Sequence, residues 1–420
     1  MNEIRASRHL GKQINRKLVL NLIKAGPTSR AEIATGSGLS AATVSNLTVE
    51  LLDEGLIHET GVVETSRGRP PVLLRLNSKA RYVVGVKVMP NALVAVVTDL
   101  DANVVGQRTL AGWGSAAATN DSLHATSAAV VERLAQLVEE VIEEAGIERS
   151  DLLGVGVGLA GIIDGVAGIC RYSPFFGWRD VDLVSPLEAQ LGLDVRLAND
   201  VDSLTIAEQW FGHGQAYEHF VVVTVGRGIG AGFVLNGRFY GGHEGGVGEL
   251  AHVTLVPDGP TCACGKRGCL ETLASDVALI AAAQAAIADG QATDLAGVDR
   301  ITIGALVAAA ESGDEVARGL LADSGRWLGV GMAMLVNLLN PQLIILAGEG
   351  VEAGEWRLAP MRRALREAQF DSLGANTRLV VEFSGDITWA RGAACVVLSD
   401  FFKSPLYQDR PVALSGGTVG

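Results

Sequence analysis

The sequence predicts an α/β protein in which a small N-terminal module of three helices and a β-hairpin precedes a larger body with two α/β lobes. Three short helical patterns fill residues 15–57, and hydrophobic strands separated by Gly turns follow from residue 81 onward. A strand-turn-strand-turn layout then occurs twice, which suggests an internal duplication. The chain has 420 residues, of which 48% are hydrophobic and 19% charged, enough for two or three domains with large cores. We therefore expect one domain at 1–80 and a second at 81–420.

Charge is divided unevenly between these two parts. The whole chain carries a net charge of -13, which alone argues against a nucleic-acid-binding protein. Residues 1–81, however, contain 12 Lys and Arg against 7 Asp and Glu, so this part carries +5 and the remainder -18. A basic module on an acidic body suits a protein that meets phosphate at one end only.

The N-terminal module begins with three predicted helices. Four residues supply the apolar face of the first: Leu18, Leu20, Leu22 and Ile23. Ser29 caps the second helix, with Glu32 at the spacing of a capping box, and Ser40 caps the third. The core face of the third helix holds three residues at helical spacing: Val44, Leu47 and Leu51.

A short Gly-containing turn between the second and third helices is typical of a helix-turn-helix. Small and polar residues begin the third helix outside its core face: Ser40, Ala41, Ala42, Thr43, Ser45 and Asn46. Such residues let a helix approach the major groove of double-stranded DNA, where Ser, Thr and Asn reach base edges. Two strands follow around "SRGRPP", and Arg67 and Arg69 at the tip form a wing for phosphate or the minor groove. A protein-interaction module with a basic hairpin is the alternative.

The body begins with a predicted three-strand meander at residues 81–110 and a long helix at 126–146. One face of this helix is apolar: Val131, Leu134, Leu137, Val138 and Val141. The uncharged strand "DLLGVGVGLAGIID" then opens into a Gly turn, and residues 219–242 repeat the hairpin layout. Two such lobes place ligands in the cleft between them, at the ends of strands.

The sequence predicts neither a secretory signal nor a membrane span. Residues 1–17 are charged and polar, without the apolar run of a signal peptide. Residues 329–348 carry no charge, but polar side chains and a proline interrupt them. We predict a buried helix that ends near Asn340, followed by a strand at 343–346. We expect a cytoplasmic protein with no membrane partner.

One short stretch, "GELAHVTLVPDGPTCACGKRGCLE", has the composition of a metal site. His252 precedes Cys262 by ten positions, and Cys264 and Cys269 complete a C-x-C-x4-C cluster. Three thiolates and one imidazole form a closed tetrahedral set, which is typical of structural zinc and leaves no open position for a catalytic water. We therefore predict a structural Zn2+ within residues 252–269. Free cysteines in a Gly-rich loop are the alternative, since a cytoplasmic location disfavours disulfides.

Acidic and imidazole groups near this stretch suit a polyhydroxylated ligand, because carboxylates accept hydrogen bonds from hydroxyl groups. Asn199 and Asp200 follow an apolar strand and precede a helix, Glu249 lies three residues before His252, and Glu271 follows the cysteines. These residues predict a sugar site. Taken alone, the Asn-Asp pair is also explained as a turn and helix cap.

The order of these motifs resembles the ROK family, which groups sugar kinases with sugar-responsive repressors. The likeness rests on the "RGRPP" wing, "AND", the E-x-x-H spacing, "CACGKRGCLE" and "VGRGIGAG", and it spans nearly the whole chain. It implies an actin-like, ribonuclease-H-like sugar-kinase fold for the body, with zinc shaping the sugar site. By the same likeness, Asp200 matches the catalytic base of the kinases. Five residues match sugar contacts, the first through its backbone: Gly161, Asn199, Glu249, His252 and Glu271.

The phosphate loops of the kinases are incomplete here. Lys87, Met89 and Asn91 stand where the resemblance places the Asp, Gly and Thr of a D-x-G-x-T loop. The loss of the Asp removes a carboxylate from the metal side of the reaction, and Met89 prevents the close backbone approach that Gly allows. "VGRGIGAG" keeps four glycines but has Arg227 in place of Thr, and "LAGEG" keeps part of a Gly-rich segment that meets adenosine. The remaining glycines are also explained by turn geometry.

The sequence therefore predicts a non-enzymatic, sugar-responsive transcriptional regulator, a repressor of carbohydrate-metabolism genes that a small sugar releases from its operator. Symmetric half-sites imply a homodimer, and the family likeness allows a homotetramer. His252 is expected to serve both metal and sugar, one ring nitrogen for each. One alternative is an ATP-dependent sugar kinase that carries a DNA-binding arm. Another is a DNA-bound regulator that senses a protein partner.

Overall fold

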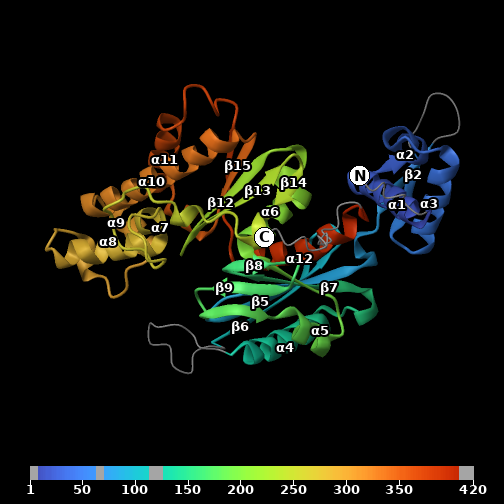
Figure 1. Cartoon of the computed structure of the whole chain (residues 1–420), viewed down its shortest axis with the longest axis horizontal. Helices are drawn as coiled ribbons and strands as arrows, with labels where there is room; N and C mark the ends of the chain where they lie inside the picture. Colours follow the sequence, from blue (N-terminus) through green and yellow to red (C-terminus); the bar gives the residue numbers. More distant parts are fainter. Residues whose placement is uncertain (1–7, 63–70, 113–125, 406–420) are drawn as a thin grey trace, which may run out of the picture.

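The structure, a computed structural model, describes residues 8–62, 71–112 and 126–405 (Figure 1). The N-terminal module lies at one end of the molecule, beside the two lobes of the body. Its helices and strands are α1 (Arg8–Lys24), α2 (Arg30–Ser37), α3 (Ala41–Asp53), β1 (Thr28–Ser29), β2 (Ile57–Val62) and β3 (Val72–Leu76). β3 pairs antiparallel with both β1 and β2, so the predicted pair of strands is present.

Both predicted helix caps of the module are present. Ser29 accepts a hydrogen bond from the backbone N–H of Glu32, and the Glu32 carboxylate accepts one from the Ser29 N–H at 2.7 Å, which completes the capping box. Ser40 caps α3 in the same way. The apolar face of α1 is displaced from the predicted one, because Val19 is buried and Leu18 is 38% exposed. Val19 belongs to a buried cluster that includes residues of α2, α3 and the body, and a local pattern does not reveal such long-range packing.

Each lobe of the body is built on a five-stranded sheet. The first sheet has the order β11-β7-β4-β5-β6: β4 (Tyr82–Val88), β5 (Ala92–Asp99), β6 (Val104–Ala111), β7 (Leu152–Leu159) and β11 (Val195–Asn199). The second has the order β14-β13-β12-β15-β16: β12 (Phe220–Val225), β13 (Ile229–Leu235), β14 (Arg238–Tyr240), β15 (Leu343–Ala347) and β16 (Arg378–Val381). In both, an antiparallel meander of three strands is extended by two parallel strands beside its first strand. This shared topology supports the predicted duplication.

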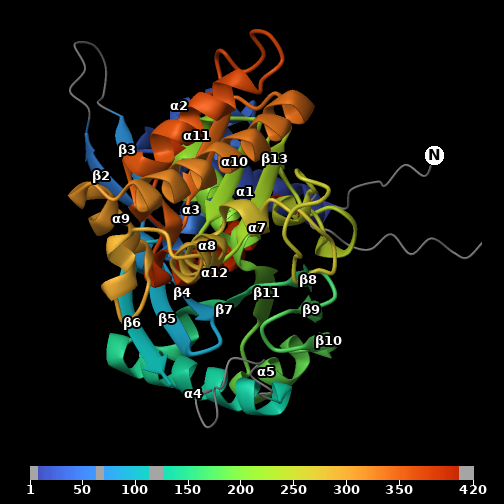
Figure 2. The same ribbon diagram turned by 90° about the vertical axis from the view of Figure 1, so that its left-hand side faces the viewer.

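Two helices of the body lie between the sheets, and other helices pack on the outer face of each sheet (Figures 1 and 2). α4 (Ser127–Ala145) and α5 (Val184–Leu191) pack on the first sheet, where the five predicted apolar residues of α4 are all buried. α7 (Glu271–Ala274), α10 (Glu315–Leu339) and α11 (Glu355–Glu367) pack on the second. α6 (Asp200–Phe211) and α12 (Asp386–Phe402) are the inner pair, and their residues share a core with β12, β13 and β15. α12 also contacts β4, β5 and β7, so it touches both lobes.

Smaller elements complete the body. β8 (Ile162–Asp164), β9 (Ile169–Ser173) and β10 (Trp178–Asp182) form a three-stranded sheet, and α8 (Asp276–Ala288) and α9 (Ile303–Ser312) pack together near the start of α10. The uncharged segment 329–348 forms the predicted helix and strand. α10 ends at Asn340, which has a left-handed backbone conformation, and the buried strand β15 follows. Across the described part of the chain, no helix has the length and apolar character needed to cross a membrane.

Candidate sugar and metal site

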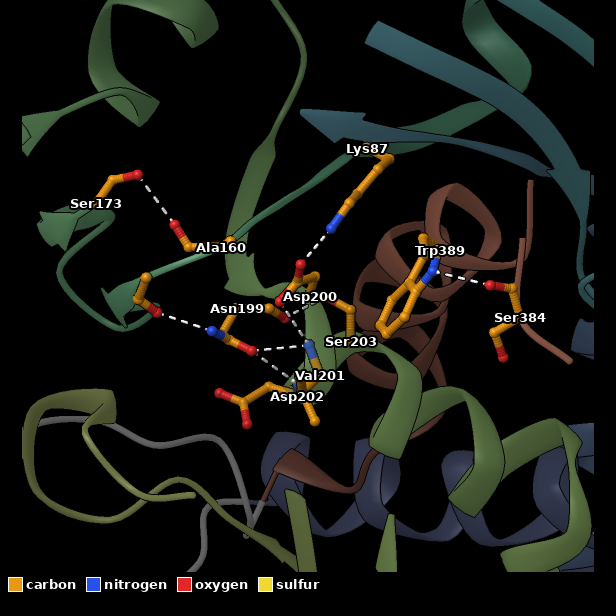
Figure 3. Close-up of polar contacts among 11 residues, drawn as sticks. Lys87, Ala160, Ser173, Asn199, Asp200, Val201, Asp202, Ser203, Ser384 and Trp389 are labelled. Atoms are coloured by element: carbon orange, nitrogen blue, oxygen red, sulfur yellow. Dashed lines mark hydrogen bonds and ion pairs between the residues drawn. The ribbon is translucent and has the colours of Figure 1, made fainter. Parts of the chain in front are cut away.

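Asn199 and Asp200 lie at the junction of β11 and α6 (Figure 3). The Asn199 side-chain oxygen accepts hydrogen bonds from the N–H groups of Val201, at 2.7 Å, and Asp202, at 3.3 Å. Its amide nitrogen donates to the Gly161 carbonyl at 2.8 Å. The helix cap that the sequence left as an alternative is therefore present. At this end of α6, two groups can still form hydrogen bonds with a ligand: the second amide hydrogen of Asn199 and the carboxylate of Asp200.

The Asp200 carboxylate forms an ion pair with the ammonium of Lys87, which reaches it from β4 (Figure 3). The Lys87 side chain is 9% exposed and that of Asp200 15%, so the pair is largely removed from water. The Trp389 ring of α12 lies 4.9 Å from the Lys87 nitrogen, within reach of a cation–π interaction. The other Asp200 oxygen accepts a hydrogen bond from the Val201 N–H at 3.0 Å.

Glu249, His252 and Glu271 come together as the sequence predicted. The Nε2 atom of His252 lies 3.7 Å from a carboxylate oxygen of Glu249 and 3.6 Å from one of Glu271. Burial raises the pKa of Glu249, and the nearby carboxylates of Glu271 and Asp200 raise it further, against the opposing effect of His252. Glu249 therefore lies near enough to Asp200 for the two carboxylates to interact electrostatically.

On its other side, His252 faces the cysteines. Its Nδ1 atom lies 3.6 Å from the sulfur of Cys262, and the sulfurs of Cys264 and Cys269 are 3.7 Å apart. All four ligand atoms fall within 4.8 Å of one another, which makes this set a group able to hold a metal ion. A tetrahedral Zn2+ with Zn–S bonds of about 2.3 Å separates its sulfurs by about 3.8 Å, so the donor set fits that ion.

Asp202 is a further acidic group in this region, and it was not among the predicted site residues. It is buried, with 8% exposure, and lies in the first turn of α6. Burial raises the pKa of Asp202 well above its ordinary value, and the carboxylates of Asp200 and Glu249 raise it further. The site thus gathers several carboxylates, of which one is balanced by Lys87.

Two of the retained glycines in the "VGRGIGAG" segment lie directly against α6. A Cβ atom on Gly232 would come within 2.0 Å of the Thr205 hydroxyl oxygen, and one on Gly230 within 2.7 Å of a Val201 methyl group. A Cβ on Gly228, in contrast, would meet nothing within 4 Å. Close packing of a strand on a helix therefore explains these two glycines, more specifically than the turn geometry that the sequence suggested.

A carboxylate occupies the place beside the first glycine of the same segment. A Cβ on Gly226 would lie 2.7 Å from a carboxylate oxygen of Glu349, which belongs to "LAGEG". Burial raises the pKa of Glu349, and the nearby ammonium of Lys87 lowers it. A carboxyl group from "LAGEG" therefore lies beside the first glycine of "VGRGIGAG".

The predicted DNA-facing residues lie on the surface of the module. Thr43 is half-buried, and the others on α3 are exposed: Ser40, Ala41, Ala42, Ser45 and Asn46. The core face of α3 is buried against α1 and α2, as its spacing predicted. Arg67 and Arg69, the predicted wing tip, lie outside the described residues.

Sequence patterns missed the partners that define this site. The sequence singled out Lys87 only because it stands where the related kinases have an Asp. Its ion pair with Asp200 was not predicted, because the two residues are 113 positions apart. Trp389 and Glu349 come from segments still farther along the chain. Two acidic residues in the first turn of α6 were a usable signal for Asp202, since helix N-termini favour negative charge.

Known proteins resemble this chain along most of its length. The ROK family model matches residues 94–400. A putative xylose repressor from Caldicellulosiruptor sp. (strain Rt8B.4) is 31% identical over 400 residues, which cover 94% of this chain and 98% of the relative. A solved ROK family transcriptional regulator, described as a homolog of the E. coli MLC protein, is 31% identical with a TM-score of 0.81 and covers 93% of this chain and 96% of its own.

A kinase structure covers a smaller share of this chain. The ROK family glucokinase from Streptomyces griseus, in complex with glucose and AMPPNP, has a TM-score of 0.63 at 28% identity and covers 75% of this chain and 98% of its own. The sugar-kinase fold that the resemblance implied for the body is therefore confirmed, and the chain belongs to the ROK family.

Proposed function

We propose that this protein is a DNA-binding transcriptional regulator, a repressor of carbohydrate-metabolism genes that a small sugar releases from its operator. Residues 1–80 bind double-stranded DNA through α3 and the wing, and residues 81–420 sense the sugar. The protein acts in the cytoplasm, as a homodimer or homotetramer whose symmetry matches paired half-sites.

The ion pair of Lys87 with Asp200 carries this proposal against the kinase alternative. In a kinase, the carboxylate at this position accepts a proton from the sugar hydroxyl, and metal and phosphate loops hold the nucleotide. Here one Asp200 oxygen is held by an ammonium and the other by a backbone N–H. The Glu349 carboxylate beside Gly226 adds negative charge where a nucleotide needs positive charge. Asp200 therefore serves as a fixed acceptor for a sugar hydroxyl.

The sugar site uses the residues that converge around α6. Asp200, Glu249 and Glu271 accept hydrogen bonds from sugar hydroxyl groups, while the Asn199 amide donates and the Gly161 backbone adds a weaker contact. His252 binds a structural Zn2+ through Nδ1, together with three cysteines, and turns Nε2 toward the sugar. The zinc fixes the orientation of this ring, so it shapes the sugar site without taking part in chemistry.

Release from DNA follows a shift in population between two arrangements of the lobes. Sugar closes the cleft, and closure changes how the two subunits hold their α3 helices, so operator affinity falls. The sugar must bind the two arrangements unequally, because a ligand with equal affinity for both shifts neither.

Calorimetry of the purified protein against D-xylose, D-glucose and N-acetylglucosamine tests the sensor. Gel shifts on the upstream region of its own gene, with and without the sugar that binds, test the response. We expect one sugar to bind and to weaken the DNA complex. DNA binding that no sugar of the panel alters would favour a protein partner as the signal.

An ATP-coupled assay with the same sugars tests the kinase alternative. We expect no turnover above background. Turnover that disappears in Asp200→Asn would establish a working kinase and contradict the purely regulatory function.

A further inference from the structure

The N-terminal module shares one hydrophobic core with the two inner helices of the body. Val19, Leu20 and Ile23 of α1 belong to the same buried cluster as Ala207 of α6 and Phe402 of α12. A module on a flexible tether would have a core of its own. The position of α1 is therefore fixed by helices that lie between the two lobes.

Lys24, the last residue of α1, makes the polar contact between α1 and α6. Its ammonium donates a hydrogen bond of 2.8 Å to the backbone carbonyl of Trp210, in the last turn of α6. The same nitrogen lies 4.3 Å from the ring centre of Phe211, 5.4 Å from that of Phe402 and 5.7 Å from that of Trp210. Three rings and one carbonyl thus surround a single ammonium, an arrangement that we call the Lys24 clasp.

The electrostatics of the clasp agree with this geometry. Burial lowers the pKa of Lys24, and the carboxylate of Asp101 partly opposes the change. Removing a charge from water is costly unless other groups replace the water. The carbonyl at the end of a helix and the faces of aromatic rings are both electron-rich groups that compensate the charge.

α6 runs from the candidate sugar site to this clasp. Asp200 begins the helix, and Trp210 and Phe211 end it. Twelve residues span about 18 Å at the rise of an α-helix. β13 presents the bare backbone of Gly230 and Gly232 to the Val201 and Thr205 side chains of α6, so α6 packs closely on this strand of the second lobe. A shift at Asp200 thus reaches Trp210 through one rigid element.

We propose that α6 is the lever that couples the sugar site to the DNA-binding module and that Lys24 is the residue that joins them. The proposal rests on the function proposed above and adds the route by which sugar acts on DNA. α1 follows the end of α6 through the clasp, and α1 packs directly on α2 and α3. Displacement of α6 on sugar binding thereby reorients α3.

Lys24→Met tests the lever, because Met keeps the apolar stem and removes the ammonium. Lys12→Met is the matched control: it lies on the same helix, removes the same charge from the module and breaks an ion pair with Glu50 inside that module. Lys24→Arg is the conservative variant, since a guanidinium also donates to a carbonyl and stacks on rings. Phe211→Leu removes one ring of the clasp and keeps Lys24.

The quantity to measure is the ratio of operator Kd with and without sugar, by fluorescence anisotropy on the upstream duplex. D-xylose, D-glucose or N-acetylglucosamine is used, whichever binds the wild type in calorimetry. We expect the ratio to fall about 3- to 10-fold in Lys24→Met and in the same direction in Phe211→Leu. It should stay at the wild-type value in Lys12→Met and near that value in Lys24→Arg. Sugar Kd and the thermal unfolding midpoint should show that each variant is folded and binds sugar.

The outcomes separate the lever from the proposed function. A wild type that binds none of the sugars overturns the proposed function and the lever with it. A wild type that responds, together with a folded Lys24→Met that responds equally, overturns the lever alone. Lys17→Met gives a further outcome, because Lys17 donates to the Phe401 carbonyl of α12. If only that variant loses the response, the signal travels through α12 and the assignment to α6 is wrong.

Discussion

Lys87→Met gives the sharpest test of the ion pair in the candidate site. The substitution removes the ammonium and leaves the Asp200 carboxylate with little access to water. Loss of one member of a buried pair costs about 3–5 kcal/mol. Here the Val201 N–H and the N-terminus of α6 still stabilise the charge, so we expect the free energy of unfolding to fall by about 2.5 kcal/mol.

The reciprocal substitution completes a double-mutant cycle. Asp200→Asn leaves the ammonium beside the Trp389 ring, which compensates part of the loss, and we expect a cost of about 2 kcal/mol. The double variant leaves neither charge alone, so we expect it also to cost about 2 kcal/mol, which makes the coupling energy about 2.5 kcal/mol.

Urea unfolding followed by tryptophan fluorescence measures the free energy of unfolding of the wild type, the two single variants and the double variant. Costs that simply add would show that Lys87 and Asp200 do not act as a pair. That result would contradict the proposal that Lys87 holds the Asp200 carboxylate in place as a hydrogen-bond acceptor, on which the regulatory function depends.

Three further predictions concern α6, the metal and pH. Gly232→Ala should destabilise the protein by about 1–3 kcal/mol, because its Cβ would meet Thr205 in the core, whereas Gly228→Ala should be nearly neutral in the same unfolding assay. Cys264→Ser should lower the zinc content from about one per chain and raise the sugar Kd about tenfold or more, by metal analysis and calorimetry. Asp202→Asn should be more stable than wild type at neutral pH, with a difference that shrinks on acidification, because the raised pKa of Asp202 makes folding oppose its ionisation.

The sign of the pH effect can be worked out for Asp202. Above the unfolded pKa of the carboxyl, the unfolded chain releases a proton that the folded chain retains, so the wild type loses stability as pH rises. The asparagine variant has no such group, and the gap between the two closes at acid pH. Thermal unfolding at several pH values measures this difference in stability, and Asp299→Asn, at an exposed position, is the control variant. A stability difference that is constant with pH would contradict the raised pKa of the buried Asp202.

Local patterns predicted the elements of this protein well because its strongest signals are local. The capping box at Ser29 and the left-handed Asn340 at the end of α10 both depend on residues within one helical turn. The four metal ligands were also predictable, since they lie within eighteen positions of one another in one loop. Where chemistry requires residues that are close in sequence, spacing alone identifies them.

The same method failed where the fold joins distant segments. Lys87 was interpreted as a missing Asp, and nothing near it in sequence indicates that its ammonium meets Asp200. The core that α1 shares with Phe402 was missed for the same reason, because that residue comes from the other end of the chain. Both contacts arise only once α6 and α12 are placed between the two sheets.

That placement explains how a kinase-like body can serve as a sensor. The duplicated sheets meet across two helices, so relative movement of the lobes must move α6, α12 or both. In a kinase such movement encloses the reactants. In the proposed regulator, Lys87 pairs with Asp200 and holds it as an acceptor, while Gly230 and Gly232 preserve the packing of α6. Phosphoryl transfer and lobe movement therefore depend on different residues. The DNA-binding module, which packs on the C-terminal ends of α6 and α12, requires only the lobe movement.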